Sequence, residues 1–263
     1  MKINLKPEQI LEQLKTDSIL KLMIKWCLCL VIVFIVMFFI HETLHGFLGL
    51  LDERSSSTGF LTVGNPYTFP DDPDFRIGWT LPTYPSLMWL LASAGPTYAG
   101  LLIAIIATII LVRFKKISIG TLIAGATMIA GTIFVILSGI FIFIRAIFGG
   151  VLHVEDKSIQ GLILAMYNKG EDLSLLTFKE TIHMPLNDLI FSPWFWLPII
   201  VPFSIALICY IIGDKKMKTL FISTFERKWF WLYTTGVPVL SIIISFSIMF
   251  WLDRIIRINW IAY

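Results

Sequence analysis

Three ionisable residues at helical spacing, His41, Glu42 and His45, are the part of this sequence best suited to chemistry. Residues four apart on an α-helix lie about 40° apart around its axis and one turn apart along it, so both imidazoles point the same way. Imidazole nitrogens bind zinc, and a neighbouring glutamate can take a proton from water that the metal activates. The pattern His-Glu-x-x-His predicts one zinc ion held by His41 and His45, with Glu42 as general base.

The surroundings of this motif make a purely structural role costly. His41, Glu42 and His45 interrupt an apolar run over residues 22–51. A charged residue near the middle of a membrane helix costs about 2.5–3.5 kcal/mol on insertion scales. Apolar side chains would pack at these positions at lower cost, so metal binding is favoured over a pair of helix-packing histidines.

The motif in its apolar context resembles the site-2 protease family of intramembrane zinc metalloproteases, which carries His-Glu-x-x-His on a membrane helix. His41, Glu42 and His45 match that motif residue by residue. Residues 93–96, Ser-Ala-Gly-Pro, are similar to a small-residue, Gly-Pro element that a following span of the family carries near the active site, and we expect them at the depth of the motif. The resemblance implies a zinc-dependent metalloendopeptidase that cleaves a membrane-protein substrate in or next to a membrane segment.

The resemblance also implies a third zinc ligand, an Asp from a later span. The family's Asn-Pro…Leu-Asp-Gly context is missing here, and the nearest equivalent is the stretch 149–156 after the third apolar run. Asp156 is the expected ligand, with Glu155 and then His153 as alternatives. Asp156 also suits the N-cap of a helix that begins at Lys157, because Asp is a favoured N-cap residue.

Long apolar runs must position these residues. Hydrophobic residues make up 57% of the 263 residues and charged residues only 15%. Because the runs exceed the roughly 18–20 residues that cross a bilayer, they predict an all-α membrane protein with about five transmembrane helices. The single domain, residues 1–263, is predicted to hold an amphipathic segment at 1–21 and spans at 22–51, 86–112, 117–148, 193–212 and 229–251. After the first span, residues 59–63 and 75–81 are expected to pair as a short β-hairpin between turn signals.

The distribution of charge predicts partners and orientation. The net charge of +3 comes from Lys and Arg beside the apolar runs, which indicates the lipid bilayer and no nucleic acid as partner. The N-terminal segment and the connections 113–116 and 214–228 are basic, whereas the other two connections are acidic or mixed. The positive-inside rule therefore predicts a multi-pass protein of the cell membrane with a cytoplasmic N-terminus. This orientation brings the motif nearer the outer side, whereas the proteases that it resembles hold theirs nearer the cytoplasm.

Two other functions use the same residues. A membrane metallopeptidase of another class, acting on extracytoplasmic peptides, would take Glu as its third ligand, and Glu155 would then outrank Asp156. A metal-binding or transport protein would use the two histidines and an acidic residue without needing Glu42 as a base. Replacement of Glu42 by Gln separates these functions, because only a protease would lose its activity and keep its zinc.

Overall fold

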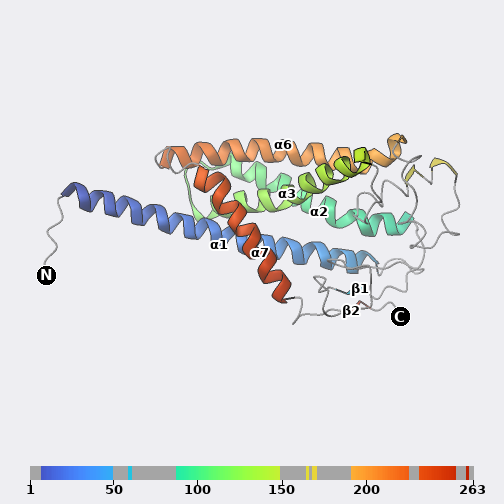
Figure 1. Ribbon diagram of the computed structural model, residues 1–263, viewed down its shortest axis with the longest axis horizontal. Coiled ribbons are helices and arrows are strands. Elements are labelled where there is room, and N and C mark those ends of the chain that lie inside the picture. Colours follow the sequence, from blue (N-terminus) through green and yellow to red (C-terminus); the bar gives the residue numbers. More distant parts are fainter. Residues whose placement is uncertain are drawn as a thin grey trace.

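Long helices make up most of the chain that the computed structural model describes (Figure 1). The described residues are 7–49, 59–60, 87–148, 164–165, 168–170, 191–224, 231–252 and 259–260. The helices are α1 (Pro7–Gly49), α2 (Leu87–Arg113), α3 (Ile119–Phe148), α6 (Pro193–Thr224) and α7 (Val237–Leu252), and the π-helical turn η4 (Leu232–Gly236) leads directly into α7.

Within the described residues, five helical segments are long and apolar enough to cross a membrane. They are Ser18–His41, Gly95–Arg113, Ile119–Ile144, Pro193–Ile222 and Leu232–Met249. Large apolar side chains cover their outer surface, with Ile32 59%, Leu102 57% and Ile208 57% exposed. Such a continuous apolar surface requires lipid as its solvent. The prediction of an all-α membrane protein with about five transmembrane helices is confirmed.

Helix α1 is continuous from Pro7 to Gly49, where the sequence predicted a separate amphipathic segment before the first span. The reason lies in its packing. Ile19 stands seven residues, or about two turns, before Trp26, and both side chains are buried in the same core cluster. The apolar stripe of the span thus begins within the stretch that the sequence assigned to the membrane surface.

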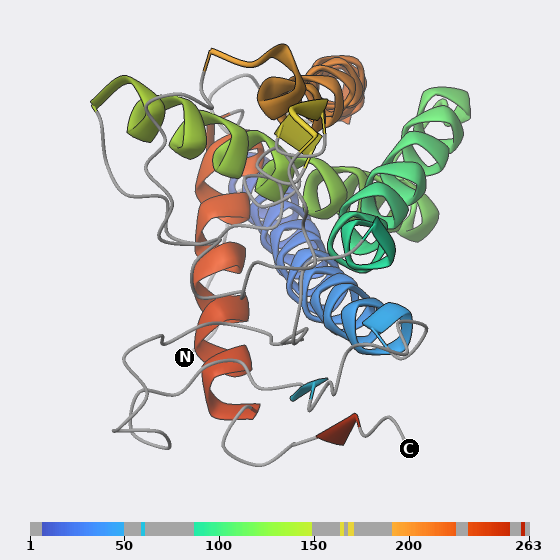
Figure 2. The same cartoon turned by 90° about the vertical axis from the view of Figure 1, so that its right-hand side faces the viewer.

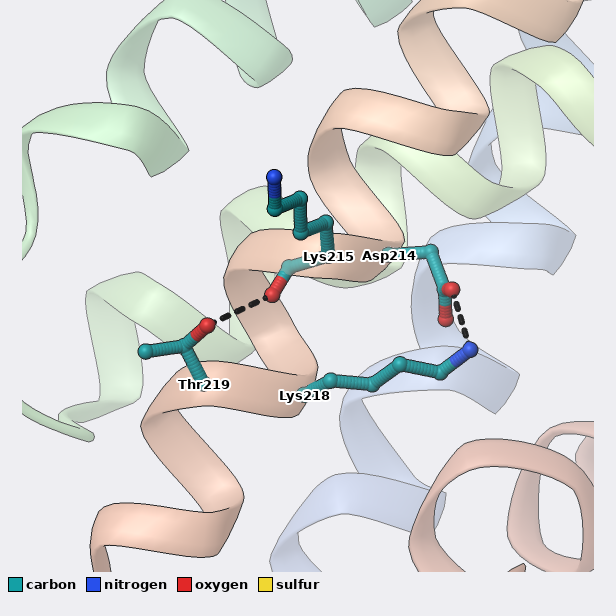
Figure 3. A network of polar contacts seen from close by, with 4 residues as sticks. All are labelled: Asp214, Lys215, Lys218 and Thr219. Carbon is teal, nitrogen blue, oxygen red and sulfur yellow. Dashed lines mark hydrogen bonds and ion pairs between the residues drawn. The ribbon is translucent and has the colours of Figure 1, made fainter.

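Helix α6 also extends further than expected, because it ends at Thr224 while the predicted span ended at residue 212. Met217, Leu220 and Phe221 follow one another at helical spacing and are buried. On the outer side, Lys218 forms an ion pair with Asp214 one turn earlier, as Figure 3 shows. The basic residues that suggested a loop lie on the exposed side of a helix whose other side packs.

The two short strands pair differently from the predicted hairpin. Strand β1 (Gly59–Phe60) pairs antiparallel with β2 (Asn259–Trp260), with Gly59 opposite Trp260. The end of the chain therefore returns to the connection that follows α1. The expected partner strand, residues 75–81, lies outside the described residues.

Helices α1, α2, α3 and α6 pack side by side in chain order and alternate in direction, whereas α7 packs against α1 (Figure 1). Between α3 and α6, for example, a Cβ placed on Gly139 would lie 2.7 Å from the Phe203 ring. At the other end of the same pair, a Cβ on Gly213 would meet Met128. These two contacts show that α3 and α6 are antiparallel. Helix α1 packs against α2, α3 and α7, and α2 also packs against α3 and α6.

Two backbones approach each other closely where α2 and α3 pack. A Cβ placed on Gly131 would lie 2.7 Å from the carbonyl oxygen of Gly100 and 2.8 Å from the Cβ of Ala104. Both distances are below ordinary van der Waals contact, so only glycine fits at position 131 without a backbone shift. Small residues at helix crossings are the usual means of close packing in membranes.

An aromatic cluster closes one end of the bundle, which we call the Trp26 end and define by Trp26, Gly125, Met217, Phe221 and Tyr233. The Trp26 side chain is 1% exposed and lies over Gly125, next to Met217. Its ring centroid is 5.9 Å from that of Phe221, and Phe221 stacks on Tyr233 at 4.9 Å. These contacts join α1, α3, α6 and η4 in one core.

A hydrogen bond from Trp26 accounts for the π-helical turn in this cluster. The N–H of Val237 donates to the carbonyl of Leu232, five residues back. The next donor in that register would be Pro238, which has no N–H to offer the carbonyl of Tyr233. The indole Nε1 of Trp26 donates to this carbonyl instead, at 3.1 Å. A ring on α1 thus supplies a hydrogen bond that a proline in α7 cannot make.

Candidate metal site

The five residues of the motif, His41 to His45, all lie on α1, which continues as a helix to Gly49. The backbone that a shared metal ion requires is therefore present, with positions 41 and 45 one turn apart and about 40° apart around the axis. Two imidazoles at such positions can reach one ion. The side chain of His41 is half-buried, and those of Glu42 and His45 lie outside the described part of the structure.

Position 41 continues the buried stripe of α1. Leu30 and Phe34 are almost fully buried along this stripe. His41 follows Leu30 by eleven residues and Phe34 by seven. Both separations are whole numbers of helical turns to within about 20° of rotation, so the three positions lie on the same side of α1. Position 45 follows Phe34 by eleven residues and so falls on the same side. The motif histidines occupy helix positions that face the bundle and not the lipid.

Helix α2 passes directly beside the motif. A Cβ placed on Gly100 of α2 would lie 3.9 Å from the Cε of Met37 on α1. Because the two helices are antiparallel, one further turn along α1 and one turn back along α2 bring His41 to within about one turn of the level of Pro96. Pro96 is buried, and so is the neighbouring Thr97. The depth that the sequence predicted for residues 93–96 stays a prediction.

Helix α3 packs against both α1 and α2 and reaches the same level. The rings of Phe34 and Phe134 meet edge to face, with centroids 5.6 Å apart. The two helices run in the same direction, so two turns further along each bring His41 level with Phe141. Helix α3 then continues to Phe148 at the same end of the bundle as Gly49.

The predicted third ligand lies outside the described residues, as do the alternatives Glu155 and His153. Asp156 is eight residues beyond the end of α3, and such a stretch spans up to about 26–29 Å when extended. The return from Phe148 to the level of His41 is about 10 Å at the rise of an α-helix. The chain is long enough for Asp156 to reach the motif.

The described residues fit a zinc ion in part. Two histidine positions on one bundle-facing side of a helix are a suitable half of a tetrahedral ligand set. Among residues whose positions the structure gives, no group of three or more His, Cys, Asp or Glu side chains lies close enough to hold a metal. A complete set of protein ligands for zinc therefore needs a further residue from outside the described residues.

Prolines lie buried inside two of the helices, and those of α6 are a feature that the sequence reasoning did not use. Pro96 lies inside α2, and Pro198 and Pro202 lie one turn apart inside α6. All three side chains are buried. Each proline removes the hydrogen bond to the carbonyl four residues earlier. A proline within an apolar run can be recognised in the sequence. Which neighbouring helix it faces cannot.

The fold and the motif together define a multi-pass helical membrane protein with a His-Glu-x-x-His sequence on its first span. Comparison with protein-family models, with curated proteins and with solved structures found no match to this chain. The assignment of function therefore rests on the residues and their geometry.

Proposed function

We propose that this protein is an intramembrane zinc metalloendopeptidase of the site-2 protease type, which hydrolyses a peptide bond in or next to a membrane segment of another protein. The observation that carries this proposal is the position of the motif. His41 and His45 stand one turn apart on a membrane-spanning helix, on the side that packs against α2 and α3. Ionisable residues that face the interior of a membrane bundle are characteristic of functional sites.

In this proposal His41, His45 and Asp156 hold the zinc ion, and Glu42 is the general base. When bound, zinc supplies the Lewis acidity that polarises a carbonyl and lowers the pKa of water toward about 7. Glu42 takes the proton of the attacking water and delivers it to the leaving amine. The substrate segment has to unwind locally, because a helix keeps its peptide carbonyls in its own hydrogen bonds.

The charges of the helices support a cytoplasmic Trp26 end in the cell membrane. Lysine and arginine concentrate on the cytoplasmic side of membrane proteins. Described basic residues near the Trp26 end are Lys21, Lys25, Arg113, Lys115, Lys116, Lys215, Lys216 and Lys218. With this orientation, the motif is reached from the outer half of the bilayer.

The experiment that tests the proposal compares wild-type protein with Glu42→Gln in cells that lack the endogenous copy. New protein N-termini in membrane fractions are identified by mass spectrometry. We expect termini within or beside apolar segments that appear with the wild type and disappear with Glu42→Gln, while purified Glu42→Gln keeps its zinc. Identical sets of termini in the two strains would contradict proteolysis.

The same variant distinguishes the alternative functions. A transporter or a structural metal site needs its ligands but has no use for a general base. Such a protein would give the same membrane peptides and the same metal content with Glu42→Gln as with the wild type. Termini confined to extracytoplasmic domains would instead indicate a metallopeptidase of another class.

A further inference from the structure

Pro96 removes the usual α-helical donor of the Ala92 carbonyl. In an α-helix this carbonyl accepts from the N–H of residue 96, and residue 96 is a proline inside α2. Gly95, the residue before Pro96, has no side-chain hydroxyl that could donate to this carbonyl in place of the missing N–H. In a membrane, a backbone carbonyl without a donor is costly, so neighbouring groups normally supply one.

Several described hydroxyl groups bond to carbonyls of their own helices. Thr108 donates to the carbonyl of Ala104 at 2.8 Å, and Thr132 to that of Met128 at 2.7 Å. Ser245 likewise donates to the carbonyl of Ser241. In each case the donor stands four residues after the carbonyl. At Ala92 that place is taken by Pro96, so a neighbouring helix is a suitable source of a donor.

Helix α1 is the element on that side. Pro96 precedes Ala107 by eleven residues, which is three turns to within about 20°. Ala107 belongs to the same core cluster as Trp26 and Phe34 of α1. With His41 within about one turn of the level of Pro96, the antiparallel arrangement brings the motif and Ala92 to the same region of the two helices. Helix carbonyls point toward the C-terminal end, so the Ala92 oxygen points along α2 toward Pro96.

The Trp26 end of the same helix provides a precedent. There a ring nitrogen of α1 donates to the carbonyl of Tyr233, which Pro238 leaves without a donor. Metal-binding histidines commonly donate their second ring N–H to a backbone carbonyl, and this hydrogen bond selects the tautomer that presents the other nitrogen to the metal.

We propose that the Ala92 carbonyl accepts a hydrogen bond from the outer ring N–H of an imidazole of the motif, and that Pro96 is a positioning residue because it keeps this carbonyl available. The inference rests on the proposed zinc site and adds the group that orients its ligand. Pro96 does not touch the substrate or the metal in this arrangement. It acts through the carbonyl that its missing N–H leaves open.

The test replaces Pro96 with alanine and, by incorporation of an α-hydroxy acid, with lactic acid. The two side chains are identical, but alanine restores the N–H to the Ala92 carbonyl and the ester of lactic acid does not. Zinc affinity is measured in detergent micelles by competition with a chromophoric chelator. We expect Pro96→Ala to bind zinc about 10–100-fold more weakly than the wild type. The lactic acid variant should bind zinc as the wild type does.

The same pair of substitutions at Pro202 is the matched control. Pro202 is also a buried proline within a membrane helix, but it lies on α6, which packs against α2 and α3. Both variants at Pro202 should keep wild-type zinc affinity. Equal zinc affinity of the alanine and lactic acid variants at Pro96, whether high or low, would overturn the proposed hydrogen bond. Absence of zinc from the wild type would instead overturn the proposed function.

A second measurement does not depend on how the Pro96 variants fold. The Ala92 carbonyl is labelled with ¹³C and ¹⁸O, and its infrared stretching band is recorded in the otherwise wild-type chain and with both motif histidines replaced by alanine. Loss of the imidazole donors should move the band to higher frequency. An unchanged band would show that neither imidazole donates to this carbonyl.

Discussion

Two regions of helix α1 show a similar arrangement, for which we propose different roles. At the Trp26 end of the bundle, a ring N–H of α1 donates to a carbonyl to which Pro238 has no N–H to offer. Near the motif, Pro96 of α2 likewise has no N–H to offer the carbonyl of Ala92. Trp26 is enclosed by aromatic rings, whereas His41 is half-buried. The comparison teaches that a proline inside a membrane helix leaves a carbonyl for which a ring on a neighbouring helix can be the donor, as Trp26 is.

The helices are also arranged differently at the Trp26 end and at the opposite end of the bundle. Helices α1, α3, α6 and η4 meet in the aromatic cluster at the Trp26 end. Figure 2 looks onto the opposite end, where the end of α1 and the start of α6 are well separated and the start of α2 lies between them. We expect the contacts at the Trp26 end to contribute the larger share of the stability.

Replacement of Trp26 by alanine is expected to have the largest effect on stability. It removes a buried ring and leaves the Tyr233 carbonyl without its donor, so the free energy of unfolding should fall by about 3–5 kcal/mol. Trp26→Phe keeps a ring and loses only the hydrogen bond, which should cost about 1–3 kcal/mol. Denaturant titration of the purified protein in micelles, followed by circular dichroism, measures both.

His41→Ala in zinc-free protein is the control at the other end of α1. Its side chain is only half-buried, so the unfolding free energy should fall by less than with Trp26→Ala. A loss as large as that of Trp26→Ala would remove the distinction between a stabilising end and a functional end.

Gly131→Ala should have the next largest effect, because the added methyl group would press on the backbone of α2. Overpacking of this kind costs about 1–3 kcal/mol. Gly213→Ala is the matched variant, since its nearest contacts would be with the Met128 side chain and not with a backbone, and alanine favours a helix by about 1 kcal/mol over glycine. Thermal unfolding should show a lower midpoint for Gly131→Ala alone. Equal midpoints for the two variants would show that the α2–α3 crossing yields more easily than these distances suggest.

Features of the fold that depend on local sequence were predictable, and those that depend on packing were not. Five apolar runs indicated five spans, because length and composition alone decide whether a helix can cross a bilayer. The end of α6 was missed, since its lysines resemble a loop until Met217 and Phe221 are seen to pack. The contact between Trp26 and Tyr233 joins residues 207 positions apart, and no short-range pattern reports it.

The same distinction holds for the candidate site. The spacing of His41 and His45 is a property of one helix, so it could be read directly from the sequence. The depth of Pro96 relative to the motif was predicted by counting residues along two antiparallel spans. The third ligand depends on how the chain returns after α3, which is a question of tertiary structure, and Asp156 stays a prediction.

Metal analysis of the purified protein tests the central claim most directly. We expect about one zinc ion per chain in the wild type, as a single-zinc site requires, and almost none in His41→Ala or Asp156→Ala at equal helix content. Zinc retained by His41→Ala at the wild-type level would contradict the claim that the motif on α1 binds the metal.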